Sequence, residues 1–174
     1  MLNLYSSSVR MSNMNSSRSP LPSQYGSVDP APPEMDGKIA TWRETLLNED
    51  EKMFQRMRVV FSLRNERSEQ AVLTLCEGFS ASSALLRHEL AYVLGQMQNP
   101  AALPSLIERL EDENEHVMVR HEAAEAMGAI GDLSVVPILK AHLSDENPEV
   151  SESCEVALDL LDWCNREEFE KQEW

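Results

Sequence analysis

The sequence has few cysteines, few basic residues and no long apolar run, and each shortage excludes a class of protein. Its 174 residues include three cysteines, an odd number without a CxxC pair, which argues against a secreted disulfide framework. Only 15 Lys and Arg stand against 30 Asp and Glu, so no nucleic-acid-binding face is expected. No apolar run approaches the ~20 residues of a membrane span, so no membrane insertion is expected. Reduced thiols together with these absences favour a cytoplasmic protein.

The acidic balance leaves two interpretations of the surface open. A net charge of −15 suits a basic protein partner or a cationic ligand. The same charge also suits simple solubility, and composition alone does not choose between the two.

Composition divides the chain into three parts. Residues 1–37 carry Ser runs and five of the nine prolines, which predicts a disordered segment or linker. This Ser-rich start, with two arginines before its first acid, weakly resembles an organelle transit peptide, but a disordered or misassigned start fits it better. In residues 38–164, Ala, Leu, Met, Val and Glu dominate, which is typical of an all-α domain. Residues 165–174 form an acidic C-terminal tail.

A repeat runs through residues 38–164. Four similar segments follow one another at offsets of 31, 33 and 33 residues, with shorter amphipathic stretches between them. A repeat of this length made of two helices is the signature of an α-solenoid, so we expect about four HEAT-like helix pairs. The four segments are Arg56–Leu63, Arg87–Leu94, Arg120–Met127 and Ser153–Leu160.

The dipeptide His-Glu occurs twice at the repeat period, as His88-Glu89 and His121-Glu122. Equivalent helices of stacked repeats lie roughly 8–10 Å apart, so imidazoles from neighbouring helices can reach one ion at bonds of ~2 Å. Two imidazoles with a carboxylate suit non-haem iron and leave positions open for oxygen. His88, Glu89, His121 and Glu122 are therefore the candidate metal ligands.

The flanking repeats serve as an internal control. Their equivalent places carry Met57-Arg58 in the first repeat and Cys154-Glu155 in the last, so the repeat fold does not itself require a His-Glu pair. The alternative is that His88 and His121 are exposed or core-capping residues that coincide through repeat duplication.

The side chains around the two pairs have simpler expected roles. Arg87 and Arg120 precede the pairs and are expected to form structural ion pairs, rather than to orient the glutamates or bind a partner. Glu125 is expected to face solvent, with a supporting place behind a ligand as the alternative. His116 and His142 lie outside the register and are expected in solvent. No GxSxG, HExxH or glycine-rich phosphate loop is present, so the corresponding enzyme classes are not expected.

Three stretches resemble one enzyme family. They are SALLRHELAYVLGQ at 83–96, MVRHEAAEAMGAI at 118–130 and ESCEVALD at 152–159. On these motifs, over roughly residues 25–163, the chain resembles deoxyhypusine hydroxylase, a HEAT-repeat non-haem di-iron monooxygenase. The resemblance implies iron as cofactor and a 5A-type translation factor as protein substrate, on which the deoxyhypusine side chain is hydroxylated to hypusine.

The resemblance covers only part of that family's architecture. Family members contain two similar halves with two His-Glu pairs each and hold the irons between the halves, whereas this chain has two pairs. Residues 27–33 resemble the linker between the halves, so the chain resembles the C-terminal half alone. The resemblance carries His88, Glu89, His121 and Glu122 over as metal ligands, with Glu89 and Glu122 alternatively binding the cationic substrate. Activity is then expected to need the missing N-terminal half or a homodimer.

Two other functions remain open. A non-catalytic HEAT scaffold would bind proteins on an acidic concave face and has no use for the His-Glu register. His121→Ala should then leave its partner binding unchanged. A lyase-like HEAT protein that handles a bilin needs an apolar or aromatic cleft, which an aromatic content of 6% makes hard to build.

Overall fold

The computed structural model describes residues 31–34 and 36–165, so most of the predicted segments 1–37 and 165–174 lies outside the described residues. The described residues form eight α-helices and no strand. Short 3-10 turns precede α5 and α7 and follow α3. The helices are α1 (Ile39–Leu47), α2 (Met53–Glu66), α3 (Glu69–Glu77), α4 (Ala84–Met97), α5 (Leu103–Glu111), α6 (Val117–Ile130), α7 (Val136–Ala141) and α8 (Pro148–Cys164).

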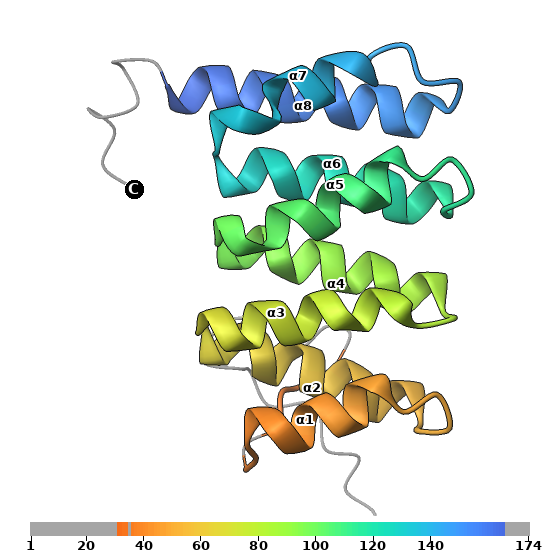
Figure 1. The fold of residues 1–174 in the computed structure, drawn as a ribbon, viewed down its shortest axis with the longest axis vertical. Helices are drawn as coiled ribbons and strands as arrows, with labels where there is room; N and C mark the ends of the chain where they lie inside the picture. Colours follow the sequence, from red (N-terminus) through yellow and green to blue (C-terminus); the bar gives the residue numbers. More distant parts are fainter. Residues whose placement is uncertain (1–30, 35, 166–174) are drawn as a thin grey trace, which may run out of the picture.

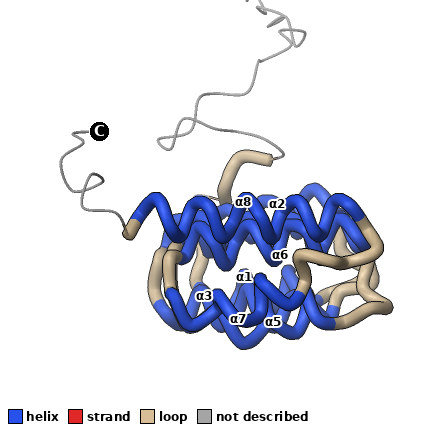
Figure 2. The backbone as a smooth tube through the Cα atoms, turned by 90° about the horizontal axis from the view of Figure 1, so that it is seen from above, coloured by secondary structure: helices blue, strands red, loops and turns tan. Residues whose placement is uncertain are grey.

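The helices stack as four antiparallel pairs. Figure 1 shows the pairs following one another in sequence order along the long axis of the molecule. Figure 2, turned by 90°, shows two layers, with the odd-numbered helices in one and the even-numbered helices in the other. In the even-numbered layer α6 packs between α4 and α8. Fully buried apolar side chains such as Leu90, Leu106 and Met127 fill the space between the layers. The predicted all-α solenoid of about four HEAT-like helix pairs is confirmed.

Polar side chains cap the N-termini of the two central even-numbered helices, α4 and α6. Ser83 Oγ accepts a hydrogen bond from the backbone N–H of Leu86 (3.3 Å) at the start of α4. The Nδ1 atom of His116 accepts one from the N–H of Met118 (3.2 Å) at the start of α6. His116 is exposed as expected, but it has this capping role. His142, also expected in solvent, is half-buried instead, and its Nδ1 lies 2.9 Å from a backbone carbonyl oxygen within α7.

Arginines, half-buried Arg87 and buried Arg120, form ion pairs that attach the even-numbered layer to the loops at one end of the stack. Arg87 Nη2 lies 2.6 Å from Glu115 Oε1, and Arg120 Nη2 lies 2.6 Å from Asp145 Oδ2. Arg120 Nε also donates to the carbonyl oxygen of Leu110 (2.9 Å). Hydrogen bonding from Arg120 lowers the pKa of Asp145 to about 2, so this pair stays charged at neutral pH. The structural ion pairs predicted for Arg87 and Arg120 are confirmed.

The fourth repeat departs from the expected register by two residues. The even-numbered helices begin at residues 53, 84, 117 and 148, so the last offset is 31 and not 33. The connection from α6 to α8, residues 131–147, is two residues shorter than the connection from α4 to α6, residues 98–116. In α8 the place of His121-Glu122 is therefore taken by Glu152-Ser153, and the expected equivalence with Cys154-Glu155 is wrong. Burial agrees with this register, because Glu122 and Ser153 are both buried.

Two glycines set the spacing of the even-numbered helices. A Cβ atom on Gly95 of α4 would lie 2.9 Å from the Cα of Ala126 in α6. A Cβ atom on Gly128 of α6 would lie 2.8 Å from the Cα of Ala157 in α8. Carbon atoms do not pack that closely against backbone, so a side chain at either place would push two helices apart.

Gly95→Ala is expected to lower the free energy of unfolding by roughly 1–3 kcal/mol, because the added methyl group forces α4 away from α6. On a solvent-exposed helix without close neighbours, the same change would stabilise the protein by about 1 kcal/mol, so the sign of the change tests the close approach. Chemical denaturation measures this change in the free energy of unfolding. Gly128→Ala is the matched control, with a similar cost that leaves the α4–α6 spacing intact. Unchanged or increased stability of Gly95→Ala would contradict the close approach.

Candidate metal centre

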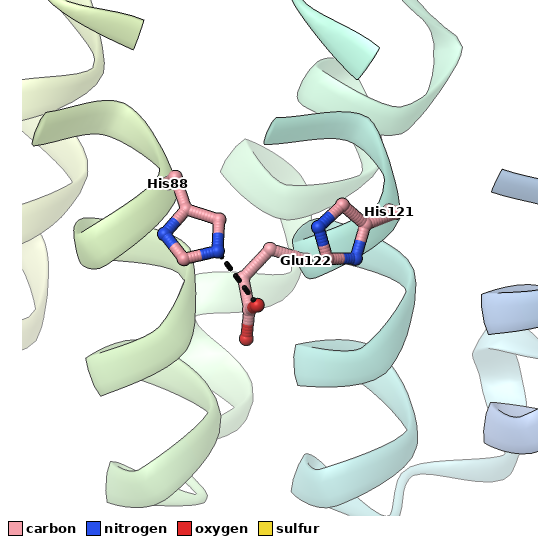
Figure 3. A group of neighbouring side chains, drawn as sticks. All are labelled: His88, His121 and Glu122. Atoms are coloured by element: carbon pink, nitrogen blue, oxygen red, sulfur yellow. Dashed lines mark ion pairs between the residues drawn. The ribbon is translucent and has the colours of Figure 1, made fainter. Parts of the chain in front are cut away.

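The two central repeats present the same residue pair at the same level. His88 follows the cap residue Ser83 by five positions, and His121 follows the cap residue His116 by five positions. Because α4 packs directly against α6, the two rings meet at the boundary between the helices. Figure 3 shows His88 on one helix, with His121 and Glu122 reaching toward it from the next.

Three of the four predicted ligands converge. The centroids of the His88 and His121 rings lie 5.7 Å apart, and His88 Nε2 lies 3.1 Å from Glu122 Oε2. Donor atoms of His88, His121 and Glu122 all lie within 4.8 Å of one another. Atoms that share one ion at ~2.1 Å bonds sit about 3–3.5 Å apart, so small side-chain rotations would complete the set. The imidazole side chains are only 25% and 26% exposed, which keeps this group partly shielded from water.

Glu89 has a different place from Glu122. It is buried on α4, with 8% of its surface exposed, and lies outside the group of converging donor atoms. Its charge nevertheless acts on His88, whose pKa it helps to raise. The structure therefore distinguishes the two glutamates that the sequence treats as equivalent. The assignment of Glu89 as a ligand stays a prediction.

Carboxylates surround His88 and favour its protonated form. The hydrogen bond to Glu122 is the main cause that raises the pKa of His88 above its ordinary value of 6.5, and burial opposes it. The charges of Glu122, Glu89 and Glu125 raise the pKa further. The other ring nitrogen, Nδ1, is buried without a hydrogen-bond partner among the described residues. These carboxylates thus favour a positive charge at Nε2 of His88, which either a proton or a metal ion supplies.

A cavity of about 450 Å³ opens beside the group. Its walls come from α4, α6 and α8, and Glu122 belongs both to this cavity and to the converging donor atoms. Tyr92, Val156 and Leu160 supply apolar wall, and Glu125 adds a second carboxylate. The arrangement can hold a ligand with an aliphatic stem and a positive charge next to a metal ion.

In the first repeat, the segment before α1 packs against the corresponding position of α2. Arg58 stands in α2 where Glu89 and Glu122 stand in α4 and α6. Its Nε donates to the carbonyl oxygen of Pro32 (3.2 Å) and its Nη2 to that of Pro33 (3.3 Å). The segment before α1 therefore packs on α2 at the position that corresponds to Glu89 and Glu122, and the first repeat has no His-Glu pair there.

Sequence reasoning missed Ser153, which donates a hydrogen bond to Glu125 beside the group (2.7 Å). The misaligned fourth repeat hid it, because Ser153 was compared with Arg120 and not with Glu122. The helix-start signal Asn147-Pro148 could have revealed the shorter connection.

The fold and site define a HEAT-repeat protein with a candidate metal centre. A family model of HEAT repeats matches residues 39–118 and 72–159, and the chain belongs to this family. None of the described helices combines the length and apolar character that crossing a membrane requires.

The relatives are more specific. The chain is 51% identical to deoxyhypusine hydroxylase of Gallus gallus over 85% of this chain and 50% of that protein. It is 47% identical to the Rattus norvegicus protein of the same name, over 84% and 48%. The solved structure of human deoxyhypusine hydroxylase in complex with glycerol matches with a TM-score of 0.79 at 48% identity, over 83% and 50%. The chain thus spans about half the length of these relatives, and the resemblance to deoxyhypusine hydroxylase is confirmed.

Glu122→Gln is expected to lower the pKa of His88, because the amide removes the strongest stabiliser of the protonated ring while burial remains. NMR titration of the imidazole resonances measures the change. Since the folded-state pKa lies above 6.5, protonated His88 adds stability at lower pH, and this stability is lost as pH rises through the raised pKa. The variant should lack this contribution.

Glu155→Gln is the matched control, since it removes one carboxylate that is exposed on α8. It should leave the pKa of His88 in place. An unchanged pKa in Glu122→Gln would show that the contact between His88 and Glu122 does not exist in solution.

Proposed function

We propose that the chain is one half of an iron-dependent monooxygenase that hydroxylates the deoxyhypusine side chain of a 5A-type translation factor to hypusine. The observation that carries the proposal is the convergence of His88, His121 and Glu122 in a chain 51% identical to a protein named deoxyhypusine hydroxylase. No observation on the described residues favours the non-catalytic scaffold.

The donor set fits iron. Two imidazoles and a carboxylate are the mixture that non-haem iron accepts while keeping positions open, and no thiol lies in the group. His88, His121 and Glu122 would hold the ion, with Glu89 as a further ligand or as a partner of the substrate cation. Bound iron would supply the activation of oxygen. Because His88 binds a proton readily, metal binding must displace that proton and should weaken in acid.

The cavity suits the proposed substrate. Deoxyhypusine is a lysine whose side chain is extended by an aminobutyl group, so it presents methylene groups and positive charge. Tyr92, Val156 and Leu160 offer apolar contact for the methylene groups, while Glu122 and Glu125 offer negative charge at the same cavity. Glu122 lies both in this cavity and among the proposed iron ligands, which would bring the substrate next to the metal.

A companion is needed to cover the open side of this site. The missing N-terminal half and a second copy of the chain are the two partners we propose, because the chain spans half the length of its relatives. Apolar side chains stand exposed beside the site, with Tyr92 43%, Val156 60% and Leu160 36% exposed. Such a patch next to buried carboxylates is suited to burial against another protein surface.

The location we propose is the cytoplasm. Cys76, Cys154 and Cys164 are free thiols, as a reducing compartment maintains them. Burial raises the pKa of Cys76, and of Cys154 to about 11, so these thiols stay protonated and unreactive.

The chain mixed with the N-terminal half of a relative is expected to hydroxylate a deoxyhypusine-bearing translation factor after anaerobic iron loading. The chain alone is expected to bind iron weakly and to show little or no turnover, because it holds ligands for about one iron. His88→Ala and His121→Ala should each remove activity of the mixture, since neither variant retains two imidazoles. Mass spectrometry of the substrate, which detects the added oxygen, measures turnover.

His142→Gln provides the control for these histidine variants, because it changes an imidazole outside the converging group. Its mixture should keep wild-type turnover. Efficient hydroxylation by the isolated monomer, or full activity of the His121→Ala mixture, would overturn the proposal.

A further inference from the structure

The two candidate imidazoles differ in what lies behind them. The Nδ1 atom of His121 lies 3.5 Å from Oε1 of Glu125, one helical turn further along α6. That same oxygen accepts a hydrogen bond of 2.7 Å from Ser153 Oγ of α8. A polar chain therefore runs from the fourth repeat through Glu125 to one of the converging histidines.

His88 has no such support. The residue one turn further along α4 is Tyr92, which occupies the place of Glu125, and the Nδ1 of His88 is buried without a hydrogen-bond partner among the described residues. The polar chain behind His121 is therefore not a by-product of the repeat. It needs a carboxylate in α6 and a hydroxyl in α8 that only this pair of repeats provides.

The contact bears on which nitrogen of His121 is free to bind a cation. A neutral imidazole carries its proton on one nitrogen and a lone pair on the other, and a carboxylate beside Nδ1 favours the proton there. The lone pair is then on Nε2. In Figure 3 one nitrogen of His121 points toward His88 and the other points away, in keeping with a ring that has Nε2 directed at the group.

Ser153 limits the freedom of the carboxylate. The side chain of Glu125 is 45% exposed, and an exposed glutamate otherwise samples several rotamers. Ser153 is buried, with 7% of its surface exposed, and its hydroxyl donates to this carboxylate. The hydrogen bond holds Glu125 on the His121 side of the cavity.

We propose that Glu125, held by Ser153, is a positioning residue that keeps the proton of His121 on Nδ1 and directs Nε2 toward the metal. This inference rests on the metal site of the proposed function. Hydrogen-bond partners of metal-bound histidines of this kind change metal affinity by about 10–100-fold when removed.

The first test uses metal-free protein, so it does not depend on iron. Nitrogen-15 NMR of the histidine rings at high pH, where they are neutral, reports the tautomer of His121. Wild type is expected to carry the proton on Nδ1, and Glu125→Ala is expected to shift it toward Nε2. Glu125→Gln keeps a neutral acceptor at the same place and should retain the wild-type tautomer. A proton on Nε2 in wild type would overturn the inference.

The second test measures Co²⁺ affinity from its visible absorption bands. Glu125→Ala should weaken binding by about 10–100-fold, and Ser153→Ala should weaken it by a smaller factor in the same direction. His142→Gln, a change at an imidazole outside the converging group, is the control and should leave affinity within about twofold. Glu155→Gln controls for loss of one negative charge.

The outcomes separate this inference from the proposed function. If wild type binds Co²⁺ and Glu125→Ala binds equally well, the positioning role is wrong and the metal site stands. If wild type binds no Co²⁺ and His121→Ala changes nothing, the metal site itself is wrong, and the inference falls with it. Equal losses in Glu125→Ala and Glu155→Gln would reduce the effect to net charge and also overturn the positioning role.

Discussion

The close packing of α4 against α6 is the constraint on which the candidate site depends. Gly95 permits this approach, since any side chain there would meet the backbone of Ala126. Because both helices begin with a capping side chain at the same distance from their histidine, packing the helices together also brings His88 and His121 together. The contact that builds the solenoid is thus also the contact that brings the donor atoms of His88 and His121 together.

The outer repeats place side chains near His88 and His121 that differ from those the repeat pattern alone would predict. The first repeat carries Arg58 in the place of a glutamate and uses it to hold the carbonyl groups of Pro32 and Pro33. The fourth repeat supplies Ser153 to Glu125 and one wall of the neighbouring cavity. The converging donor atoms lie at the central boundary because the flanking helices carry different side chains at the same level, while their backbones follow the same repeat.

Much of this could be predicted from the sequence, for a physical reason. Helical periodicity and the repeat determine which residues face a neighbouring helix, so the solenoid and the pairing of His88 with His121 follow from spacing alone. Spacing did not show which neighbouring helix each glutamate faces, and therefore it could not separate Glu122, which reaches His88, from Glu89, which does not join the group. It also missed Ser153, because the shortened connection before α8 moved the register by two residues. Contacts between repeats depend on helix ends, which short loops change without altering the periodic pattern.

The central claim is that the boundary between α4 and α6 binds iron. Anomalous diffraction at the iron absorption edge, from crystals of the chain loaded anaerobically with Fe²⁺, tests it most directly. The account predicts a peak between the imidazoles of His88 and His121, within bonding distance of Glu122. Fully loaded crystals with no peak there, or with iron held only by other side chains, would contradict it.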